Sequence, residues 1–392
     1  GSYFDYCTIK YNSNGVQQWV QYYDGPGHGI DQAEEIAVDK VGNIYVTGFS
    51  SQVGNNFDYA TIKYSPDGRE LWVRRYGPGG PATYVNGMAV DDICNVYITG
   101  WNNTNAVTIK YDSSGTQLWV KTYSGIVGGT GANSIALDKY NNVYITGFSF
   151  GLYTWRDYFT IKYSSSGVWK WVRRFSIDST IYSTSIANSI AVDDIGNIYV
   201  SGFTSLNAAD PRKITTLRYT NSGDLIWVQR DTAVLSNESS YMVVDNNNNI
   251  YVSGSTSNLP NYSSYTTIKY DSGGLQQWRE KYNFQSGNSE PSCLKVDKEF
   301  NVFVTGRAGG NMGTIKYSQP VGIININNQI PKNYKLNQNY PNPFNPITRI
   351  RFELPKATFV KILIYDVLGR EVYTLINGNI NVGAYEVVWN AG

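Results

Sequence analysis

Histidine and cysteine are nearly absent from this chain, which has one His and three Cys among its 392 residues. A metalloenzyme with several His ligands is therefore excluded, and so is a catalytic triad that needs a second His. Cys7, Cys94 and Cys293 fall at three unrelated positions of the repeat described below. This spacing favours free thiols over a disulfide framework or a zinc site. We expect neither a cofactor nor a bound metal.

An excess of one charge and long apolar segments are also lacking. Lys and Arg total 32 against 31 Asp and Glu, which gives a net charge of +1. A nucleic-acid binder usually carries a basic excess on one face, so the sequence argues against one. No apolar run approaches the roughly 18 residues that a membrane span requires. We therefore expect no nucleic-acid partner and no membrane span.

A repeat dominates what the chain does contain. The phrase Thr-Ile-Lys-Tyr, or a near copy, occurs seven times, at Thr8, Thr61, Thr108, Thr160, Thr216, Thr267 and Thr314. After each of the first six copies a Trp follows eleven residues on, at Trp19, Trp72, Trp119, Trp171, Trp227 and Trp278. A second cassette lies between the copies and runs from an Asp through an Asn to a Gly nine residues on. Its six copies begin at Asp39, Asp91, Asp138, Asp193, Asp245 and Asp297.

This pattern predicts an all-β fold. Both cassettes alternate as strands do, and turns such as Ser65-Pro66-Asp67-Gly68 place a Gly where a tight hairpin needs a positive φ. With the apolar run before each Asp, the unit has four short antiparallel strands in about 50 residues, as in a β-propeller blade. A row of immunoglobulin-like sandwiches would need nearly twice that length per unit.

The repeat does not fix the number of blades directly. We favour six, with the N-terminal strand that carries Trp19 completing a last blade begun by 294–296 and 301–306. One copy of the phrase, at Thr8 or at Thr314, is then surplus. Seven blades are the alternative, and they would require two strands missing from the N-terminus.

Two resemblances extend this interpretation. The block Ile-Ala-Val-Asp-x-x-Gly-Asn-Ile-Tyr-Val-Thr-Gly, followed by Tyr-x-Thr-Ile-Lys-Tyr-x-x-x-Gly-x-x-x-Trp, resembles the SBBP type of bacterial β-propeller repeat over 1–317. Residues 318–333 break the repeat and look like a linker. The stretch 334–392 resembles the C-terminal sorting domains of type IX secretion, through the motif Tyr340, Pro341, Asn342, Pro343, Phe344, Asn345 and Pro346.

These resemblances imply a secreted or cell-surface propeller that bears no defined activity. They also imply a small immunoglobulin-like β-sandwich that is recognised by the type IX secretion machinery. The chain stops at Gly392, before the strands and basic tail that usually finish such a domain. We therefore expect the sorting domain to be truncated here.

Aromatic residues outside the repeat register are the candidate binding residues. They are Tyr153, Trp155 and Arg156, in an irregular loop rich in aromatics, and Trp101. An exposed aromatic loop suits stacking on a sugar or anchoring a protein partner. The plainer explanation is that such aromatics cover a blade edge.

Other polar residues have structural explanations. The cassette Asp and Asn are better explained as caps of a hairpin turn than as a calcium loop. The basic residue of each phrase could attract an anion, but we expect its head group to reach an Asp of a neighbouring cassette. His28 has no nucleophile near it in the sequence, so we expect no catalytic role for it.

The sequence thus predicts a non-catalytic propeller for binding or adhesion, or for an extracellular assembly. Its partner would be a protein, a surface glycan or a second copy, the last forming a filament by strand exchange because free strand edges recruit strands. The alternative is a glycan-active hydrolase or lyase with carboxylates converging at the central funnel. Glu34 and Glu35, near Asp31, would favour that enzyme if they faced another carboxylate.

Overall fold

The computed structural model describes residues 4–52, 56–77, 83–178, 183–207, 209–258, 262–284, 287–298, 300–317, 324–327, 331–344 and 346–390. These residues form thirty β-strands, which confirms the all-β prediction. Within these ranges, no helix has the length and apolar character that crossing a membrane requires.

The repeat folds as a four-stranded antiparallel sheet, as predicted. The first complete copy has the order β3 (Asp31–Val38), β4 (Ile44–Ser51), β5 (Phe57–Tyr64), β6 (Glu70–Tyr76). Between β5 and β6 the N–H of Gly68 donates to the carbonyl of Ser65 at 2.9 Å, and Gly68 has a φ of 90°. Gly adopts this left-handed conformation readily, so the turn has the residue it requires.

The same order recurs along the chain. Two further four-stranded sheets comprise β7 (Tyr84–Val90), β8 (Val96–Trp101), β9 (Ala106–Tyr111), β10 (Gln117–Tyr123), and β11 (Thr130–Leu137), β12 (Val143–Ser149), β13 (Asp157–Tyr163), β14 (Trp169–Phe175). A seven-stranded sheet follows, with β15 (Thr184–Val192), β16 (Ile198–Ser205), β17 (Lys213–Tyr219), β18 (Leu225–Val244), β19 (Ile250–Asn258), β20 (Tyr262–Tyr270) and β21 (Gln276–Tyr282). The long strand β18 pairs first with β17 and then with β19, so it serves two consecutive repeats.

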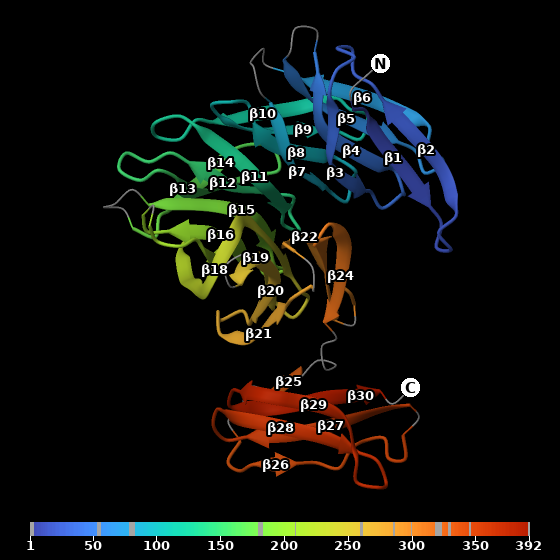
Figure 1. Ribbon diagram of the computed structural model, residues 1–392, viewed down its shortest axis with the longest axis vertical. Coiled ribbons are helices and arrows are strands. Elements are labelled where there is room, and N and C mark those ends of the chain that lie inside the picture. The colour runs from blue at the N-terminus through green and yellow to red at the C-terminus, as the bar shows by residue number, and fades with distance from the viewer. Residues whose placement is uncertain are drawn as a thin grey trace.

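Incomplete sheets lie at both ends of this array, which follows an arc in Figure 1. One consists of β1 (Tyr6–Tyr11) and β2 (Gln17–Tyr23), and the other of β22 (Ser289–Val296), β23 (Val302–Ala308) and β24 (Asn311–Tyr317). The strand with Trp19 was expected to complete the last sheet, but in the described residues β2 pairs with β1 in a sheet of their own, and β24 takes the place beside β23. β24 follows β23 through a short turn, which costs less entropy than pairing β23 with β1, some 300 residues away. The number of blades stays a prediction.

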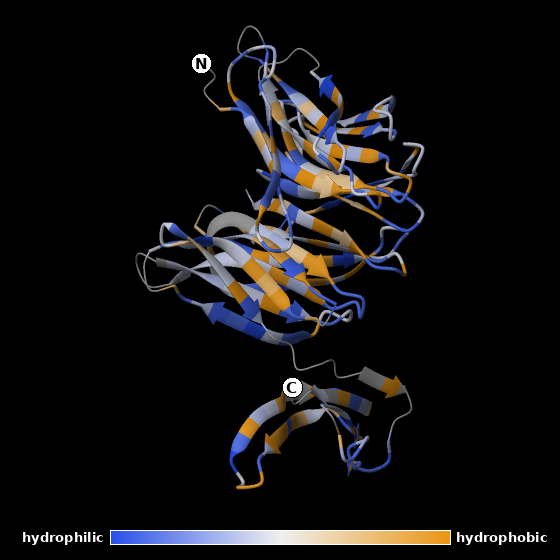
Figure 2. Cartoon of the chain, turned by 90° about the vertical axis from the view of Figure 1, so that its right-hand side faces the viewer, coloured by the Kyte–Doolittle hydropathy of each residue, from blue (hydrophilic) through white to orange (hydrophobic). Residues whose placement is uncertain are grey.

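The hydrophobic cores lie between neighbouring sheets, and apolar and polar residues alternate along the strands in Figure 2. Trp72 shows the pattern: its ring centroid lies 5.9 Å from Tyr45 of its own sheet and 6.3 Å from Tyr111 of the next. Tyr45 and Tyr111 are almost completely buried. The repeated Trp is therefore a core residue between two sheets.

The same Trp residues are hydrogen-bonded to the next sheet. Each indole Nε1 donates to a turn carbonyl at 3.0–3.2 Å, in the pairs Trp19–Pro66, Trp72–Ser113, Trp119–Ser165, Trp171–Asn221 and Trp227–Ser272. The basic residue of the phrase donates to the same carbonyl in every case, from Lys10, Lys63, Lys110, Lys162 and Arg218. We call this shared contact the inter-sheet latch.

The latch corrects the expected partner of these cations. We expected the basic head group to reach an Asp of a neighbouring cassette, but in these five residues it binds a carbonyl oxygen. The cassette Asp is already saturated. Asp138, for example, accepts the N–H groups of Tyr140 and Asn142 and the side chains of Asn142 and Tyr144, all at 2.8–2.9 Å. The prediction that this Asp caps its turn is confirmed.

The C-terminal strands form two further sheets. One has the order β25 (Ile324–Asn327), β30 (Gly383–Asn390), β27 (Ile347–Leu354), β26 (Lys335–Leu336), and the other pairs β28 (Thr358–Tyr365) with β29 (Glu371–Ile380). Phe352, Leu375, Ile376 and Val387 belong to one core that both sheets share. A two-layer β arrangement is therefore present, whereas an immunoglobulin-like topology stays a prediction. β25 lies within the predicted linker and pairs with β30.

The predicted sorting motif follows the edge of this core. The backbone of Tyr340 forms two hydrogen bonds of 2.9 Å with Arg349 in β27, and its side chain is 78% exposed. The ring of Phe344 lies 5.0 Å from Trp389 in β30. Asn345 lies outside the described residues. The motif thus exposes one aromatic side chain and packs another against the sheet.

Glu386 is a buried carboxylate in this C-terminal part. It accepts a hydrogen bond from Arg349 at 2.7 Å and one from Arg351 at 2.6 Å. Burial raises the pKa of Glu386, but the two guanidinium groups outweigh burial and hold the pKa below its usual value. A lowered folded-state pKa stabilises the fold above the ordinary Glu pKa of about 4.3. That contribution is lost as the pH falls through the folded-state value.

We expect Glu386→Gln to lower the free energy of unfolding of the C-terminal part by about 1–3 kcal/mol at pH 7. The difference from wild type should shrink below about pH 4.5. Denaturant unfolding at a series of pH values measures it, with Glu371→Gln, at an exposed position, as the control. An equal loss of stability at pH 3 and pH 7 would exclude the ion pairs as its cause.

Candidate functional site

A continuous row of aromatic rings crosses three neighbouring sheets. Each ring contacts the next, with centroids 5.3–6.4 Å apart. In order, the residues are Phe57, Phe49, Tyr84, Trp101, Phe148, Phe150 and Trp155. We call these seven residues the aromatic row.

The repeat explains why these rings line up. Phe49, Trp101 and Phe148 each follow directly on the Gly that ends the cassette, in β4, β8 and β12. Because the sheets share one register, the same position presents its side chain at the same edge of each sheet. The next repeat has Phe203 at this position, where the side chain is completely buried. The exposed row therefore ends at the sheet that begins with β11.

Two glycines make room for the rings in that sheet. Gly131 lies opposite Phe148, and a Cβ on Gly131 would stand 2.7 Å from the Phe148 ring. Gly129 has a φ of 61°, and a Cβ there would stand 2.2 Å from the ring of Phe150. Neither position can take a side chain unless a ring moves, so both glycines help to place the row.

The loop that follows Phe150 is tied to the next sheet. Trp155 N–H donates to the carbonyl of Ser183 at 2.9 Å, and Ser185 N–H donates to the carbonyl of Arg156 at 2.8 Å. These backbone bonds hold Trp155 with 57% of its surface exposed. The exposed end of the row is thus fixed by the adjacent sheet before any ligand arrives.

Three of the four predicted binding residues meet in this site. Trp101 and Trp155 belong to the row, and the guanidinium of Arg156 lies 4.7 Å from the centroid of Phe148. Tyr153 is 73% exposed and extends from the same loop. The sequence analysis overlooked Phe148, although its place after the cassette Gly, shared with Trp101, was a usable signal. A binding role for these residues stays a prediction.

Ion pairs flank the row at both ends. Arg75 pairs with Asp58 at 3.2 Å, and Arg174 pairs with Asp157 at 2.7 Å. Arg156 differs, because it makes no ion pair within the described ranges of the chain. One positive charge next to Phe148 and Phe150 is therefore left without a carboxylate.

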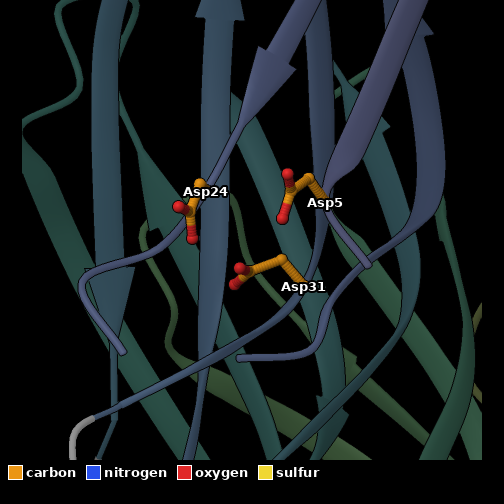
Figure 3. Close-up of side chains that lie close together, drawn as sticks. All are labelled: Asp5, Asp24 and Asp31. Carbon is orange, nitrogen blue, oxygen red and sulfur yellow. The ribbon is translucent and has the colours of Figure 1, made fainter. Parts of the chain in front are cut away.

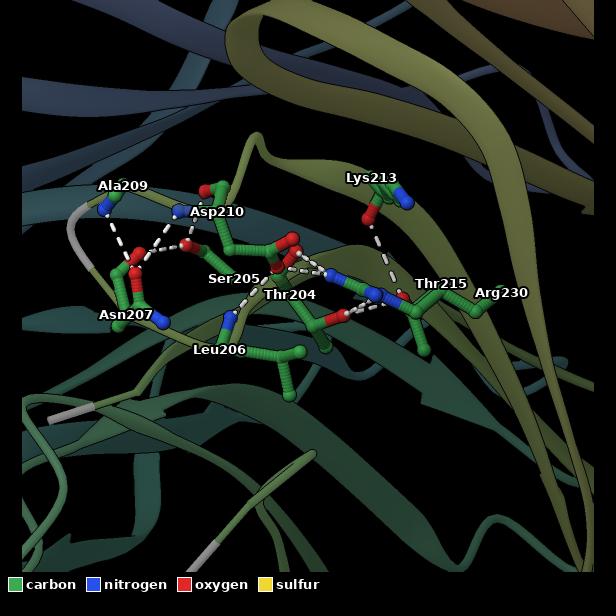
Figure 4. A network of polar contacts seen from close by, with 9 residues as sticks. All are labelled: Thr204, Ser205, Leu206, Asn207, Ala209, Asp210, Lys213, Thr215 and Arg230. Carbon is green, nitrogen blue, oxygen red and sulfur yellow. Dashed lines mark hydrogen bonds and ion pairs between the residues drawn. The ribbon is translucent and has the colours of Figure 1, made fainter. Parts of the chain in front are cut away.

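The next sheet shows the same type of ion pair inside a larger network (Figure 4). Arg230 contacts Asp210 at 2.5 Å and donates to Thr204 Oγ1 at 3.0 Å, while Leu206 N–H donates to Asp210 at 2.8 Å. Burial raises the pKa of Asp210, but the Leu206 N–H and Arg230 together lower it below its usual value. All these bonds lie between β16, β18 and the loop after β16, so the network fixes that loop.

Asp5, Asp24 and Asp31 form a cluster that the sequence analysis missed, because the three belong to separate segments (Figure 3). One carboxylate oxygen from each lies within 4.8 Å of the others. Oxygen ligands of this kind suit a hard cation such as Ca²⁺. The two oxygens of Asp31, however, accept the N–H groups of Gly25 and Ser51 at 3.0 and 3.2 Å. The cluster supports its own loop, and we assign no metal to it.

His28 lies beside this cluster at an exposed position. Its Nδ1 is 2.7 Å from Asp24, and this hydrogen bond, with the charge of Asp24, raises the pKa of the imidazole. The side chain is exposed, and among the described residues its close polar partner is the carboxylate of Asp24 on the same loop.

Glu34 and Glu35 lie in β3, at the edge of their sheet. Burial raises the pKa of both residues. Lys295 in β22 lowers the pKa of Glu35 and is thus the charge that reaches it from another sheet. The neighbouring carboxylate of Glu34 raises the pKa of Glu35, and the charge that acts on Glu35 from another sheet is that of a cation.

Two family models match parts of this chain. Residues 18–57 match the SBBP beta-propeller repeat, and residues 338–386 match a secretion system C-terminal sorting domain. The predicted kinds of repeat and of C-terminal domain are therefore confirmed. No curated protein matches the chain. The sorting domain places the protein outside the cell or at its outer surface, through type IX secretion.

Solved structures resemble the chain at low sequence identity. Virginiamycin B lyase from Staphylococcus aureus is 11% identical over 72% of this chain and 83% of its own, with a TM-score of 0.44. A protein from Lactobacillus plantarum is 11% identical over 96% of this chain and 92% of its own, with a TM-score of 0.47. The β-propeller domain of the Trilobed protease from Pyrococcus furiosus, described as having an open velcro topology, is 9% identical over 82% and 88%, with a TM-score of 0.45.

Proposed function

From its propeller repeat and its sorting domain, we propose that this secreted or cell-surface chain is a non-catalytic propeller that binds sugar chains through the aromatic row. One observation carries the proposal: seven aromatic rings are in continuous contact across three sheets, and Trp155 at one end is 57% exposed. Six blades remain our preferred number, and an immunoglobulin-like sandwich our preferred topology for the C-terminal part.

The physical case rests on the shape and rigidity of the row. Aromatic side chains offer large flat apolar faces with few rotatable bonds, so little conformational entropy is lost on binding. Sugar rings have apolar C–H faces that such surfaces accommodate. Tyr84 and Trp155 are 37% and 57% exposed, and the loop of Trp155 is held by the backbone of Ser183. A pre-organised aromatic surface of this kind favours adhesion to a long polymer.

The environments of Glu35 and of the cassette Asp residues support a non-catalytic role. A glycosidase requires two carboxyl groups that flank the bond to be cleaved. Glu35 is instead influenced by Lys295, and the cassette Asp residues are occupied in turn caps. The alternative, a glycan-active hydrolase or lyase, predicts shortened sugar chains after incubation, which size-exclusion chromatography of the products would reveal.

We expect Trp155→Ala to weaken binding to oligosaccharides at least about tenfold, because it removes an exposed aromatic anchor. Affinity electrophoresis or calorimetry against a panel of polysaccharides measures the effect. The matched control is Tyr140→Ala, which removes a 67% exposed aromatic that lies outside the row. Equal binding by wild type and both variants would exclude the row as the binding surface.

An extracellular assembly is a second candidate function, favoured by the two end sheets. Ile9 and Tyr11 of β1 are 41% and 55% exposed, whereas Ile62 and Tyr64, their counterparts in β5, are 0% and 2% exposed. In the described part of the chain, β24 pairs with β23 alone and leaves its outer edge open. Open strand edges recruit strands from other chains, which would give head-to-tail polymers if the contact does not close.

If assembly occurs, Ile9→Asp should reduce the particle mass in light scattering to that of a monomer. Ile195→Asp, at a 72% exposed Ile in a turn, should leave the mass unchanged. A monomeric wild-type chain, with no filaments in electron micrographs, would exclude this second candidate.

A further inference from the structure

Arg156 has an unusual environment for a half-buried cation. Its guanidinium lies 4.7 Å from the centroid of Phe148 and 5.6 Å from that of Phe150. Its Nε is buried and has no hydrogen-bond acceptor among the described residues. A buried charged donor without an acceptor is costly, so this position requires an explanation.

Other arginines near the same edge of the sheets are neutralised. Arg75, Arg174 and Arg230 pair with Asp58, Asp157 and Asp210 at 3.2, 2.7 and 2.5 Å. The carboxylate nearest to Arg156 in sequence is Asp157, which is already paired with Arg174. The Arg156 end of the row therefore keeps one positive charge that no described residue balances.

The guanidinium carbon of Arg156 lies 4.7 Å from the centroid of Phe148, and the backbone of Arg156 is bound to Ser183 and Ser185. Its Nε is buried, so a ligand would contact the two terminal nitrogens of the guanidinium. Their N–H groups match the geometry of a carboxylate or sulfate. Arg156 is thus pre-organised to bind an anionic group beside the exposed ring of Trp155.

The opposite end of the row has the reverse charge. Asp31 is paired across the sheet with Ser50, the neighbour of Phe49, and it belongs to the cluster with Asp5 and Asp24. These carboxylates disfavour an anion at the Phe49 end. A ligand along the row would therefore place its negative group at Arg156.

We propose that the ligand of the aromatic row is an acidic polysaccharide, whose carboxylate or sulfate binds Arg156 while adjacent sugar rings stack on Trp155 and Phe150. This inference rests on the proposed function, and it adds the charge of the ligand and the residue that recognises that charge. It also gives a reason why Arg156 has no acidic partner of its own.

The test compares matched acidic and neutral polymers. The probes are polygalacturonate with its methyl ester, and carboxymethyl cellulose with hydroxyethyl cellulose, each measured by affinity electrophoresis on the full chain. Wild type should bind each acidic member about tenfold more tightly than its neutral partner. Arg156→Gln should abolish this difference, and Arg156→Lys should restore only part of it, because lysine lacks the planar edge.

Arg212→Gln is the matched control, since the Arg212 guanidinium lies 5.6 Å over Phe203 in the next sheet, beyond the end of the row. This variant should keep the full preference for acidic polymers. Circular dichroism of each variant separates lost binding from lost folding.

Each outcome separates this inference from the function on which it rests. If acidic and neutral polymers bind equally and Trp155→Ala weakens both, the sugar-binding proposal stands and the preference for an acidic ligand is overturned. An acidic preference that survives Arg156→Gln would overturn the role of Arg156. No binding to any of the four polymers would overturn both.

Discussion

Asp138→Ala is expected to lower the free energy of unfolding by about 3–5 kcal/mol. The Asp138 carboxylate accepts four hydrogen bonds, from two backbone N–H groups and from the side chains of Asn142 and Tyr144. Tyr144 is 0% exposed, so water cannot replace Asp138 as the acceptor for its hydroxyl when the carboxylate is removed. Each buried donor that loses its acceptor costs about 1–3 kcal/mol.

The chemistry of the Tyr144 hydroxyl agrees with this role. Burial raises the pKa of Tyr144, and the neighbouring Asp138 carboxylate raises it further. The hydroxyl therefore stays protonated at all ordinary pH values and remains a donor to Asp138.

Variants at two positions give the experiment its contrast. Asp138→Asn keeps an oxygen for the backbone N–H groups but points an NH₂ group at two donors, so we expect about half the loss seen with alanine. Asp224→Ala removes a turn carboxylate that is exposed, and it should cost much less than Asp138→Ala. Urea unfolding followed by Trp fluorescence measures all three. Unfolding of Asp138→Ala at the wild-type midpoint would refute the structural role of the cassette Asp.

The features that repeat could be predicted from the sequence, because each depends on local chemistry. The strands follow from alternation, the hairpin turns from Gly68 and its counterparts, and the turn caps from the spacing of Asp138 and Asn142. The inter-sheet latch could not be predicted in this way. Its acceptors are backbone carbonyls, such as that of Ser113, which carry no signal in the sequence. The cations were therefore assigned to carboxylates.

The candidate site was predicted only in part, for a similar reason. Trp101 and Trp155 can be recognised in the sequence because they lie outside the register of the repeated Trp. Phe148 looks like an ordinary strand residue, and its sequence signal is its place after the cassette Gly, which it shares with Trp101. The contact of its ring with Trp101, and the room that Gly131 leaves for it, appear only in the structure. The pairing of the end sheets could not be predicted from the side chains, because β1 and β24 carry the same phrase and fit the same partner strand.

Trp119→Ala should be as damaging as Asp138→Ala, with a loss of about 3–5 kcal/mol in the free energy of unfolding. Its ring lies 6.0 Å from Tyr97 and 6.4 Å from Tyr163 of the next sheet, so its removal opens a cavity between two sheets. Trp155→Ala removes the same side chain from an exposed site and should change stability by less than about 0.5 kcal/mol. A comparable loss from both variants would show that burial between the sheets is not what makes Trp119 important.

The inter-sheet latch predicts that the stability losses of two variants are coupled, which packing alone does not predict. Trp119 and Lys110 both donate to the carbonyl of Ser165, at 3.2 and 3.1 Å. Trp119→Phe or Lys110→Met alone leaves that oxygen one donor, whereas the double variant leaves it none. The double loss should therefore exceed the sum of the two single losses by about 0.5–2 kcal/mol, the range typical of residues that share a partner. Denaturant unfolding of the four proteins in this cycle measures the coupling, and strictly additive losses would mean that the shared carbonyl does not link the two sheets.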